Sequence, residues 1–579
     1  MTQTGAECLA AGLKLLGVRY AFGVSGGAIS FFWSALATAG IDVTHFRHES
    51  GAAFAACEAS IATEMPVVVF VTSGPGLTNA LTGAYAARHE AGRVILVSAH
   101  TDAAMHGRQP IQETGPRTFP QSGIFTEGPW FDYAAVVSAA DQLPEVLSGL
   151  NDAARKPTGL VAHISLSLSS QRQVLPPQAS AFRLDSPHAA ASAQQNGVFT
   201  RASSISHAEE VYERLRDSSW LIWVGGGARG STDAIRRLAS TAGVPTMATP
   251  RGKGVIAESD ETYIGVTGFA GHLSAVAYLE SNRPDYILVL GSGLGDFASG
   301  YNRSYEPGVA FIHVDLDSDK HRRAYPAVET VPVVADIGPF CEELADLLDG
   351  APEGSLAGAG VSPFDRRPIT ATDELIDPRT LMDAVQAVLV DHGIPVMAET
   401  GNGLAWAINR LRIDRAAGWR APAGMVGAMG HFTAGVVGVA IATSQKVAAL
   451  VGDGSMLMTS EVSTAVHRRA PAIWIVLNDS RYNMCEQGAA VLGLEQVDCS
   501  IPRTDFAGLA RALGASGLAV SDVAELVPAL EWAIRADGPA VVDVRIDPRV
   551  PAPTAGRNAG LLKASETAPQ RVRMDTGSR

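Results

Sequence analysis

Two aspartates in the last third of the chain stand where strand-like runs end, and their surroundings suit a bound cation. Asp453 lies between Gly452 and Gly454 directly after the apolar run VAALVG, and Asp479 ends the next such run, AIWIVLND. Glycines let the backbone approach a ligand, and the start of a following helix favours phosphate groups. A divalent cation would take carboxylate oxygens on one side and phosphate oxygens on the other. The pattern predicts a metal–diphosphate site, with two unrelated turns as the plainer alternative.

The segment between the two acids must bring them together. Residues 456–469 (MLMTSEVSTAVHRR) have the composition of one helix. A strand–helix–strand connection of this length returns the chain beside its starting strand. Because parallel sheets bind ligands at the carboxyl ends of their strands, we expect Asp453 and Asp479 to be neighbours there.

Short apolar, β-branched runs alternate with helical stretches along most of the chain, which is typical of parallel α/β sheets. The first stretch contains the runs YAFGV, VTHFRH, VVVFVT and RVILVSA, and the last contains IPVMAET, KVAALVG, AIWIVLN and AVVDVRI. Residues 173–197 and 349–368 show no clear hydrophobic periodicity, which predicts that they are linkers. The expected fold is α/β with three domains, each a parallel sheet flanked by helices. Their limits are 1–172, 198–348 and 369–550, followed by a polar tail at 551–579.

Composition narrows the class of protein. The 579 residues carry a formal net charge of −14 with no basic run, which argues against nucleic-acid binding. Five scattered cysteines without a CxxC pair fit reduced thiols, and the first residues lack the features of a signal peptide, so we expect a cytoplasmic protein. The uncharged segment 20–41 reads as strand, glycine turn and helix rather than as a membrane span.

GDGS, followed by a helix and an apolar strand ending in Asn-Asp, resembles the cofactor motif of thiamine diphosphate enzymes of the acetohydroxyacid synthase and pyruvate oxidase superfamily. The resemblance implies Mg²⁺ bound by Asp453, Asp479 and the backbone carbonyl of Arg481. This chain has Asp where Asn is usual, and its connection is one residue shorter, so Asn478 stays open as an alternative ligand. The cofactor-binding residues implied at this motif are Gly452, Gly454 and Ser455.

Motifs in the first domain extend the resemblance. In FRHESGAAFAA (46–56), Glu49 corresponds to the glutamate that hydrogen-bonds N1′ of the cofactor's aminopyrimidine, although an acid that only complements a helix dipole is the alternative. FGVSGGA (22–28) resembles a family loop that places Gly26 and Gly27 at the cofactor. TSGPGLTNAL (72–81) resembles the family's GPG turn, and RQPIQET (108–114) resembles the stretch whose glutamine, here Gln112, faces the substrate. His106 is a candidate substrate contact, although a structural histidine is the commoner case.

Motifs in the last domain imply the rest of the cofactor site. ETGNGLAW (399–406) matches the first diphosphate-contacting loop and implies Gly401 and Asn402 as contacts. GAMGHFTAGVVG (427–438) resembles the loop that holds the aminopyrimidine, through the carbonyl of Gly427 and the side chain of Met429. Met429 as plain core filler is the alternative. The segment SRYNMCEQGAAVLG (480–493) caps the active site in relatives, and we expect two of its residues to contact the substrate, Asn483 and Glu486.

The middle domain contains a different pattern. Gly225, Gly227 and Gly230 form GxGxxG after a strand-like run, but the acid that a dinucleotide site places about 20 residues later is missing. Several relatives bind FAD in this domain with an arginine in the stretch that corresponds to 290–300, and that arginine is absent. FAD is therefore an open but disfavoured alternative.

The resemblance implies a function. We expect a thiamine diphosphate and Mg²⁺ enzyme that decarboxylates a 2-oxo acid, with pyruvate as the expected donor, and transfers the two-carbon unit to a carbonyl acceptor. A non-ligating decarboxylase or carbon–carbon lyase is the first alternative, and a cofactor-free regulatory subunit is a remote one. The family pairs the Glu49 domain of one subunit with the diphosphate domain of another, so a homodimer or homotetramer is expected.

Overall fold

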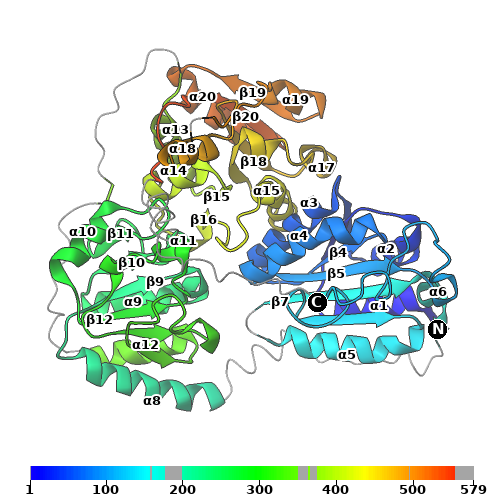
Figure 1. Ribbon diagram of the computed structural model, residues 1–579, viewed down its shortest axis with the longest axis horizontal. Helices are drawn as coiled ribbons and strands as arrows, with labels where there is room; N and C mark the ends of the chain where they lie inside the picture. Colours follow the sequence, from blue (N-terminus) through cyan, green and yellow to red (C-terminus); the bar gives the residue numbers. More distant parts are fainter. Residues whose placement is uncertain are drawn as a thin grey trace, which may run out of the picture.

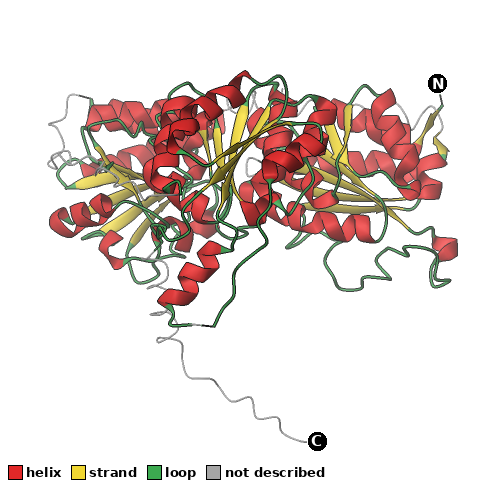
Figure 2. Ribbon diagram, turned by 90° about the horizontal axis from the view of Figure 1, so that it is seen from above, coloured by secondary structure: helices red, strands yellow, loops and turns green. Residues whose placement is uncertain are grey.

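The computed structural model describes residues 2–156, 159–175, 198–349, 363–364, 375–494 and 496–554. Side chains of the helix that starts at Val198 are described from residue 207 onward. Most of the two predicted linkers and residues 555–579 of the predicted tail lie outside these ranges. Three lobes follow one another along the chain in Figure 1, and helices cover both faces of each sheet in Figure 2.

The N-terminal lobe is a six-stranded parallel sheet with strand order β3-β2-β4-β5-β7-β6. All four strand-like runs predicted here form strands. The strands are β2 (Tyr20–Gly23), β3 (Asp42–His45), β4 (Val67–Val71), β5 (Arg93–His100), β6 (Tyr133–Val137) and β7 (Leu160–Ser167). The helices are α1 (Gly5–Leu15), α2 (Ser30–Thr38), α3 (Glu49–Thr63), α4 (Pro75–Glu90), α5 (Leu143–Ala154) and α6 (Leu168–Arg172). A short antiparallel pair joins β1 (Gln3–Thr4) to β8 (Val174–Leu175).

The central lobe is a second six-stranded parallel sheet, with strand order β11-β10-β9-β12-β13-β14. The strands are β9 (Trp220–Val224), β10 (Thr246–Ala248), β11 (Tyr263–Val266), β12 (Tyr286–Leu290), β13 (Ala310–Val314) and β14 (Thr330–Val333). The helices are α8 (Val198–Leu215), α9 (Thr232–Ala242), α10 (Leu273–Asn282), α11 (Asp296–Ser299) and α12 (Ile337–Leu348).

The C-terminal lobe repeats the plan with strand order β16-β15-β17-β18-β20-β19. The strands are β15 (Val396–Ala398), β16 (Trp419–Arg420), β17 (Val447–Gly452), β18 (Ala472–Asn478), β19 (Ser516–Val520) and β20 (Ala540–Arg545). The helices are α13 (Pro378–Val385), α14 (Asn402–Arg410), α15 (His431–Thr443), α16 (Asp453–Met456), α17 (Val462–Arg468), α18 (Asn483–Val491), α19 (Phe506–Ala512) and α20 (Val523–Arg535). Every residue of β18 is buried, because the strand is internal and helices cover both faces of its sheet.

Each sheet reverses its strand order beside its first strand along the chain. The reversal lies between β2 and β4 in the first lobe, between β9 and β12 in the second, and between β15 and β17 in the third. Open α/β sheets bind ligands outside the carboxyl ends of strands at such a point, because the following loops diverge and leave a crevice. The loop after β15 carries Gly401 and the loop after β17 carries Asp453, so both diphosphate motifs lie at a reversal.

The lobes share their cores. One buried cluster includes Val69 of β4, Val436 of α15 and Trp474 of β18. Helix α3 packs along α15, and Figure 1 shows the two helices side by side between the first and third lobes. A Cβ added to Gly438 would lie 2.1 Å from the Ala55 carbonyl oxygen, so the crossing is as close as glycine permits.

The single helix predicted for residues 456–469 is wrong. The chain forms α16, a turn, and then α17, because the Thr459 hydroxyl accepts the Glu461 backbone N–H and competes with helical hydrogen bonding. The break places the Glu461 carboxylate against the backbone N–H groups of Arg47 and His48 in the first lobe.

Candidate active site

Asp453 and Asp479 meet at the carboxyl edge of the third sheet, as predicted. Strands β17 and β18 are paired, with Gly452 opposite Leu477. The Asp453 carboxylate accepts the backbone N–H of Gly454 at 2.7 Å and that of Ser480 at 2.6 Å. Ser480 has a φ of 61°, and this left-handed turn follows Asp479 directly. The second acid is therefore presented beside the first.

The two acids repel each other. Burial, together with the charge of Asp453, raises the pKa of Asp479 to about 7. Asp479 Oδ2 accepts a hydrogen bond of 2.7 Å from the Asn483 amide, which offsets only part of this. Asn478, the alternative ligand, points elsewhere, since its amide donates to Asp543 at 2.8 Å and to the Thr504 carbonyl at 3.0 Å. A divalent cation between Asp453 and Asp479 would relieve the repulsion.

The loop after β15 offers unused polar atoms beside the acids. Gly401 has a φ of 136° and open space around it, and Asn402 begins α14. Thr400 Oγ1 and Asn402 Oδ1 are buried and have no hydrogen-bond partner among the described residues. The Thr400 hydroxyl can donate to a diphosphate oxygen, and the Asn402 amide oxygen, which only accepts, can take a hydrogen bond from water in the solvent shell of the diphosphate.

The loop at 427–430 contacts the Gly-Asp-Gly turn. A Cβ on Gly454 would lie 3.2 Å from the Met429 methyl carbon and 2.6 Å from the Tyr482 ring. Gly427 has a φ of 55°, which turns the loop two residues before Met429. Ser455 is buried behind the turn, with its carbonyl oxygen 3.5 Å from the Thr433 hydroxyl.

Glu399 joins the two cofactor loops, a role that its place at the start of the ETGNGLAW motif did not predict. Its Oε2 atom accepts the backbone N–H groups of Phe432 at 2.8 Å and Thr433 at 3.0 Å, and its Oε1 atom accepts that of Thr400. The carboxylate thus caps α15 while holding the start of the diphosphate loop. Burial raises its pKa, against the effect of these hydrogen bonds.

The first lobe gathers its predicted residues at its own carboxyl edge. Glu49 begins α3, and its Oε2 atom accepts a hydrogen bond of 3.1 Å from the Asn79 amide of α4. A Cβ on Gly76 would lie 3.6 Å from Glu49 Oε1. Asn79 lies in the predicted GPG motif, but spacing alone gave no sign that it reaches Glu49.

The other predicted residues of the first lobe surround this edge. Gly26 lies against Thr72, where an added Cβ would come within 2.5 Å, and Gly27 has open space. Gln112 has a φ of 57°, unusual outside glycine, and lies over Gly74. His106 is 3.5 Å from Glu113.

Within the described part of one chain, the two sets of residues are not joined. Between described residues, no hydrogen bond or ion pair links Glu49 to the loops that carry Asp453 and Asp479. Helix α3 touches His431 through Glu58 and reaches the start of α17 near Gly51. Glu49 therefore lies at the end of α3 that points away from the loop at 427–430.

The predicted substrate residues of α18 are engaged by the chain itself. Asn483 donates to Asp479 and, at 3.0 Å, to the Pro548 carbonyl. Glu486 accepts two bonds of 2.9 Å from the Arg481 guanidinium. Their roles toward a substrate stay predictions, while Asn483 has a defined role in holding Asp479.

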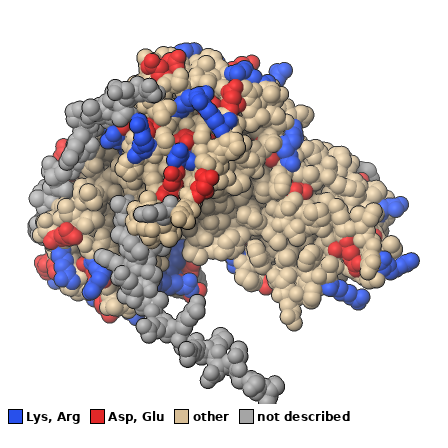
Figure 3. Space-filling view, turned by 45° about the horizontal axis from the view of Figure 1, so that its top comes forward, with Lys and Arg blue, Asp and Glu red and all other residues tan. Residues whose placement is uncertain are grey.

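A cleft of about 2490 Å³ starts at the cofactor loops. Its wall contains Thr400, Gly401 and residues 422–427 of the third lobe, and it continues to Gly226 and Gly291 at the sheet reversal of the central lobe. Acidic and basic side chains alternate among the described residues on the face in Figure 3, so this face presents no field of one sign.

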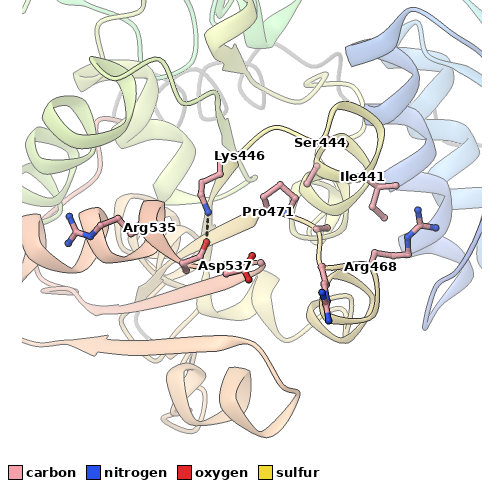
Figure 4. A pocket seen from close by; sticks show the side chains of 12 residues that line it. Ile441, Ser444, Lys446, Arg468, Pro471, Arg535 and Asp537 are labelled. Atoms are coloured by element: carbon pink, nitrogen blue, oxygen red, sulfur yellow. Dashed lines mark hydrogen bonds between the residues drawn. The ribbon is translucent and has the colours of Figure 1, made fainter.

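A smaller hollow of about 530 Å³ lies at the opposite, amino ends of β17 and β18. Figure 4 shows its cationic side chains spread around the rim, with Lys446 donating to the Ala536 carbonyl at 2.6 Å. Arg468 is bound by Asp42 of the first lobe. Lys446 and Arg468 are thus bound within the chain, and the candidate site lies at the cofactor loops, where the larger cleft begins.

Three comparisons agree with this geometry. Models of the thiamine pyrophosphate enzymes match the chain in order: the N-terminal TPP binding domain at residues 3–118, the central domain at 209–344, and the C-terminal TPP binding domain at 399–544. The chain belongs to the thiamine pyrophosphate enzymes. Its three parallel α/β lobes are the three domains of that family, and thiamine diphosphate is the cofactor that the family implies.

Two relatives of this thiamine pyrophosphate enzyme cover almost its whole length. The acetolactate synthase isozyme 1 large subunit of Escherichia coli is 25% identical over 556 residues, which are 94% of each chain. An acetolactate synthase of Mycobacterium bovis is 27% identical over 574 residues, 93% of this chain and 87% of the relative. The enzyme is therefore acetolactate synthase-like.

A solved structure shares the fold. The thiamine diphosphate-dependent 4-hydroxybenzoylformate decarboxylase of Rhodococcus jostii superposes with a TM-score of 0.79 at 19% identity, covering 94% of this chain and 99% of that one. None of the comparisons supports FAD. No helix among the described residues combines the length and apolar composition that a bilayer span needs.

Proposed function

We propose that this enzyme uses thiamine diphosphate and Mg²⁺ to decarboxylate pyruvate and to join the two-carbon unit to a second 2-oxo acid. The observation that carries the proposal is the acid pair Asp453 and Asp479 beside the orphaned atoms of the diphosphate loop. Its full-length similarity to acetolactate synthases supports ligation as the second half of the reaction.

The residues present fit the cofactor. Asp453, Asp479 and the Arg481 carbonyl would hold the metal ion, and Thr400, Gly401 and Asn402 would hold the diphosphate. When bound, thiamine diphosphate supplies a carbon nucleophile and an electron sink for decarboxylation. Glu49 would hold and exchange a proton at Oε1, since Asn79 fixes only Oε2. Gln112, at the same edge, would orient the substrate.

The complete site requires two chains. Glu49 lies nine residues before Glu58, about 13 Å along α3 at 1.5 Å per residue, and Glu58 is the residue that meets His431 beside the cofactor loop. Its own loop at 427–430 is therefore out of reach of Glu49. A second copy that presents Glu49 to the metal site would complete the arrangement, which makes a homodimer the smallest active form.

Product analysis tests the proposal. Purified protein with thiamine diphosphate, Mg²⁺ and labelled pyruvate is expected to release carbon dioxide and to form a five-carbon 2-hydroxy-2-methyl-3-oxobutanoate, detected by mass spectrometry. Release of acetaldehyde alone would replace ligation with simple decarboxylation. A protein that leaves pyruvate unchanged while binding the cofactor would exclude pyruvate as the donor.

A further inference from the structure

The ten residues 421–430 connect β16 to α15 and line the large cleft. Both ends of this segment are fixed by carboxylates of another lobe. We propose that Glu58 and Glu90 of the N-terminal lobe are positioning residues for this segment, and through it for the aminopyrimidine half of the cofactor. The second half of the inference rests on the proposed function, and the first does not.

Glu58 holds both ends of the segment at once. Arg420, just before it, donates to Glu58 through Nε at 2.8 Å and through Nη2 at 2.7 Å. His431, just after it, contacts Glu58 Oε1 through Nε2 at 3.0 Å. A two-pronged guanidinium contact fixes orientation as well as distance, so the two ends of the segment have a defined separation.

Glu90 fixes the segment near its start. Its Oε1 atom accepts the backbone N–H of Ala423, and its Oε2 atom accepts from Arg420 at 3.1 Å and from Arg251 of the central lobe at 2.6 Å. All three lobes therefore meet at this carboxylate. Val426 and Gly427 in turn donate to the Ala423 carbonyl, which carries the constraint to within two residues of Met429.

The cluster is buried, and its opposite charges are in direct contact. Glu58 and His431 are each 1% exposed, and Glu90 is 5% exposed. Burial alone would raise the pKa of Glu58, but Arg420 and His431 outweigh it and lower that pKa. His431 also stacks on Phe54 of α3, with ring centroids 4.9 Å apart. Moving the segment away from these contacts would leave buried charges unpaired. The contacts therefore hold the segment in one position.

Close packing fixes the position of α3, the helix that carries Glu58, relative to α15. A Cβ on Gly435 would lie 2.8 Å from Glu58 Cγ, which requires glycine at that position. The helices cannot move apart without losing this close packing. The Glu58 carboxylate therefore keeps a constant position relative to the segment.

The test compares Glu58→Gln with a matched control. Glu258→Gln removes an equally buried charge that pairs with Lys253 at 2.8 Å and accepts the Ile413 backbone N–H, but that does not touch residues 421–430. Glu90→Gln serves as a second variant that disturbs only the first anchor, should Glu58→Gln fail to fold. Melting temperatures of all variants record the general loss of stability.

Two readouts separate the two halves of the inference. Amide hydrogen exchange of the cofactor-free protein should be about tenfold faster within residues 421–430 in Glu58→Gln or Glu90→Gln, and unchanged there in Glu258→Gln. Thiamine diphosphate affinity, from circular dichroism titration, should fall about tenfold in the same variants and by less than about twofold in the control.

Each possible outcome supports or overturns a stated part of the inference. The positioning role is overturned if hydrogen exchange in residues 421–430 and cofactor affinity change only in proportion to the loss of melting temperature, and do so equally in the test and control variants. Faster exchange in the segment with unchanged affinity would confine the role to the segment and overturn its extension to the cofactor. A wild-type protein that binds no thiamine diphosphate would contradict the proposed function, while the exchange data would still decide the positioning of the segment.

Discussion

Glu49 has one carboxylate oxygen fixed by Asn79 and one without a hydrogen bond to the described residues, so replacing it with glutamine is informative. The amide keeps the shape of the side chain and loses its capacity to take up a proton. We expect Glu49→Gln to lower kcat by about 10²–10⁴-fold, the usual contribution of a general acid–base group. Steady-state kinetics with pyruvate measures this.

Cofactor binding is the control for Glu49→Gln. Affinity for thiamine diphosphate should stay within about threefold of the wild type, since the lost interaction belongs to the transition state. A variant that turns over at the wild-type rate would remove Glu49 from the mechanism. A variant that simply fails to bind the cofactor would make Glu49 a binding residue.

Asp479 and Asn478 are adjacent but have different surroundings, which permits a matched pair of variants. Asp479→Ala should weaken Mg²⁺-dependent cofactor binding by at least about tenfold, as expected for loss of a metal ligand. Asn478→Ala should instead lower the free energy of unfolding by about 1–3 kcal/mol, because Asp543 would lose a buried hydrogen bond. Calorimetric titration with Mg²⁺ and thermal unfolding distinguish the two. The reverse pattern would make Asn478 the ligand.

At the residue level, much of the site could be predicted and a part could not. The positions of Asp453, Asp479 and Gly401 follow from glycines and acids at strand ends, because parallel strands share one functional edge. The contacts of Asn79, Glu399 and Glu58 depend on side chains from elements far apart in sequence. No local spacing announces them, so they required the structure.

At the scale of elements, the close crossing of α3 and α15 makes a sharp prediction. Gly438→Ala would place a methyl group 2.1 Å from the Ala55 carbonyl oxygen, so the helices must separate. We expect a loss of about 1–3 kcal/mol or more in the free energy of unfolding. Gly418→Ala is the control, since a Cβ there meets nothing within 4 Å. Equal stability of the two variants in denaturant unfolding would contradict the crossing.

The order and type of most elements were predictable, and one break was not. Apolar, β-branched runs identified four of the six strands in each of the first and third sheets, because buried parallel strands are apolar throughout. The segment 456–469 has helical composition, yet it divides into α16 and α17. The local Thr459 hydrogen bond and the contact of Glu461 with the first lobe outweigh propensity there, and the second of these is tertiary.

At the scale of the whole molecule, the junction around His431 predicts a pH dependence of stability. Burial alone would lower the pKa of His431, but Glu58 raises it above its ordinary value of 6.5. A raised pKa in the folded state contributes stability that is complete below pH 6.5 and is lost as pH rises through the folded value, by about 1.4 kcal/mol per pKa unit. His431→Gln should therefore destabilise most at pH 6 and less at pH 9.

Thermal unfolding of wild type and His431→Gln across that range measures the difference, while other titrating groups are common to both proteins. The carboxylates of Glu58, Glu90 and Glu399 raise the pKa of His431, and Arg420 is bound to two of them, Glu58 and Glu90. If the difference in melting temperature instead grows toward pH 9, the assignment of a stabilising positive charge to His431 is wrong.

The most direct measurement of the central claim is hydrogen–deuterium exchange at the reactive carbon of thiamine diphosphate, followed by NMR after rapid quenching. The claim is that Asp453 and Asp479 hold the cofactor through Mg²⁺ while Glu49 activates it. The wild-type protein with Mg²⁺ should exchange this proton at least about 100-fold faster than free cofactor does, and Glu49→Gln should lose that acceleration. Exchange at the rate of the free cofactor in a wild-type protein that binds it would contradict the account.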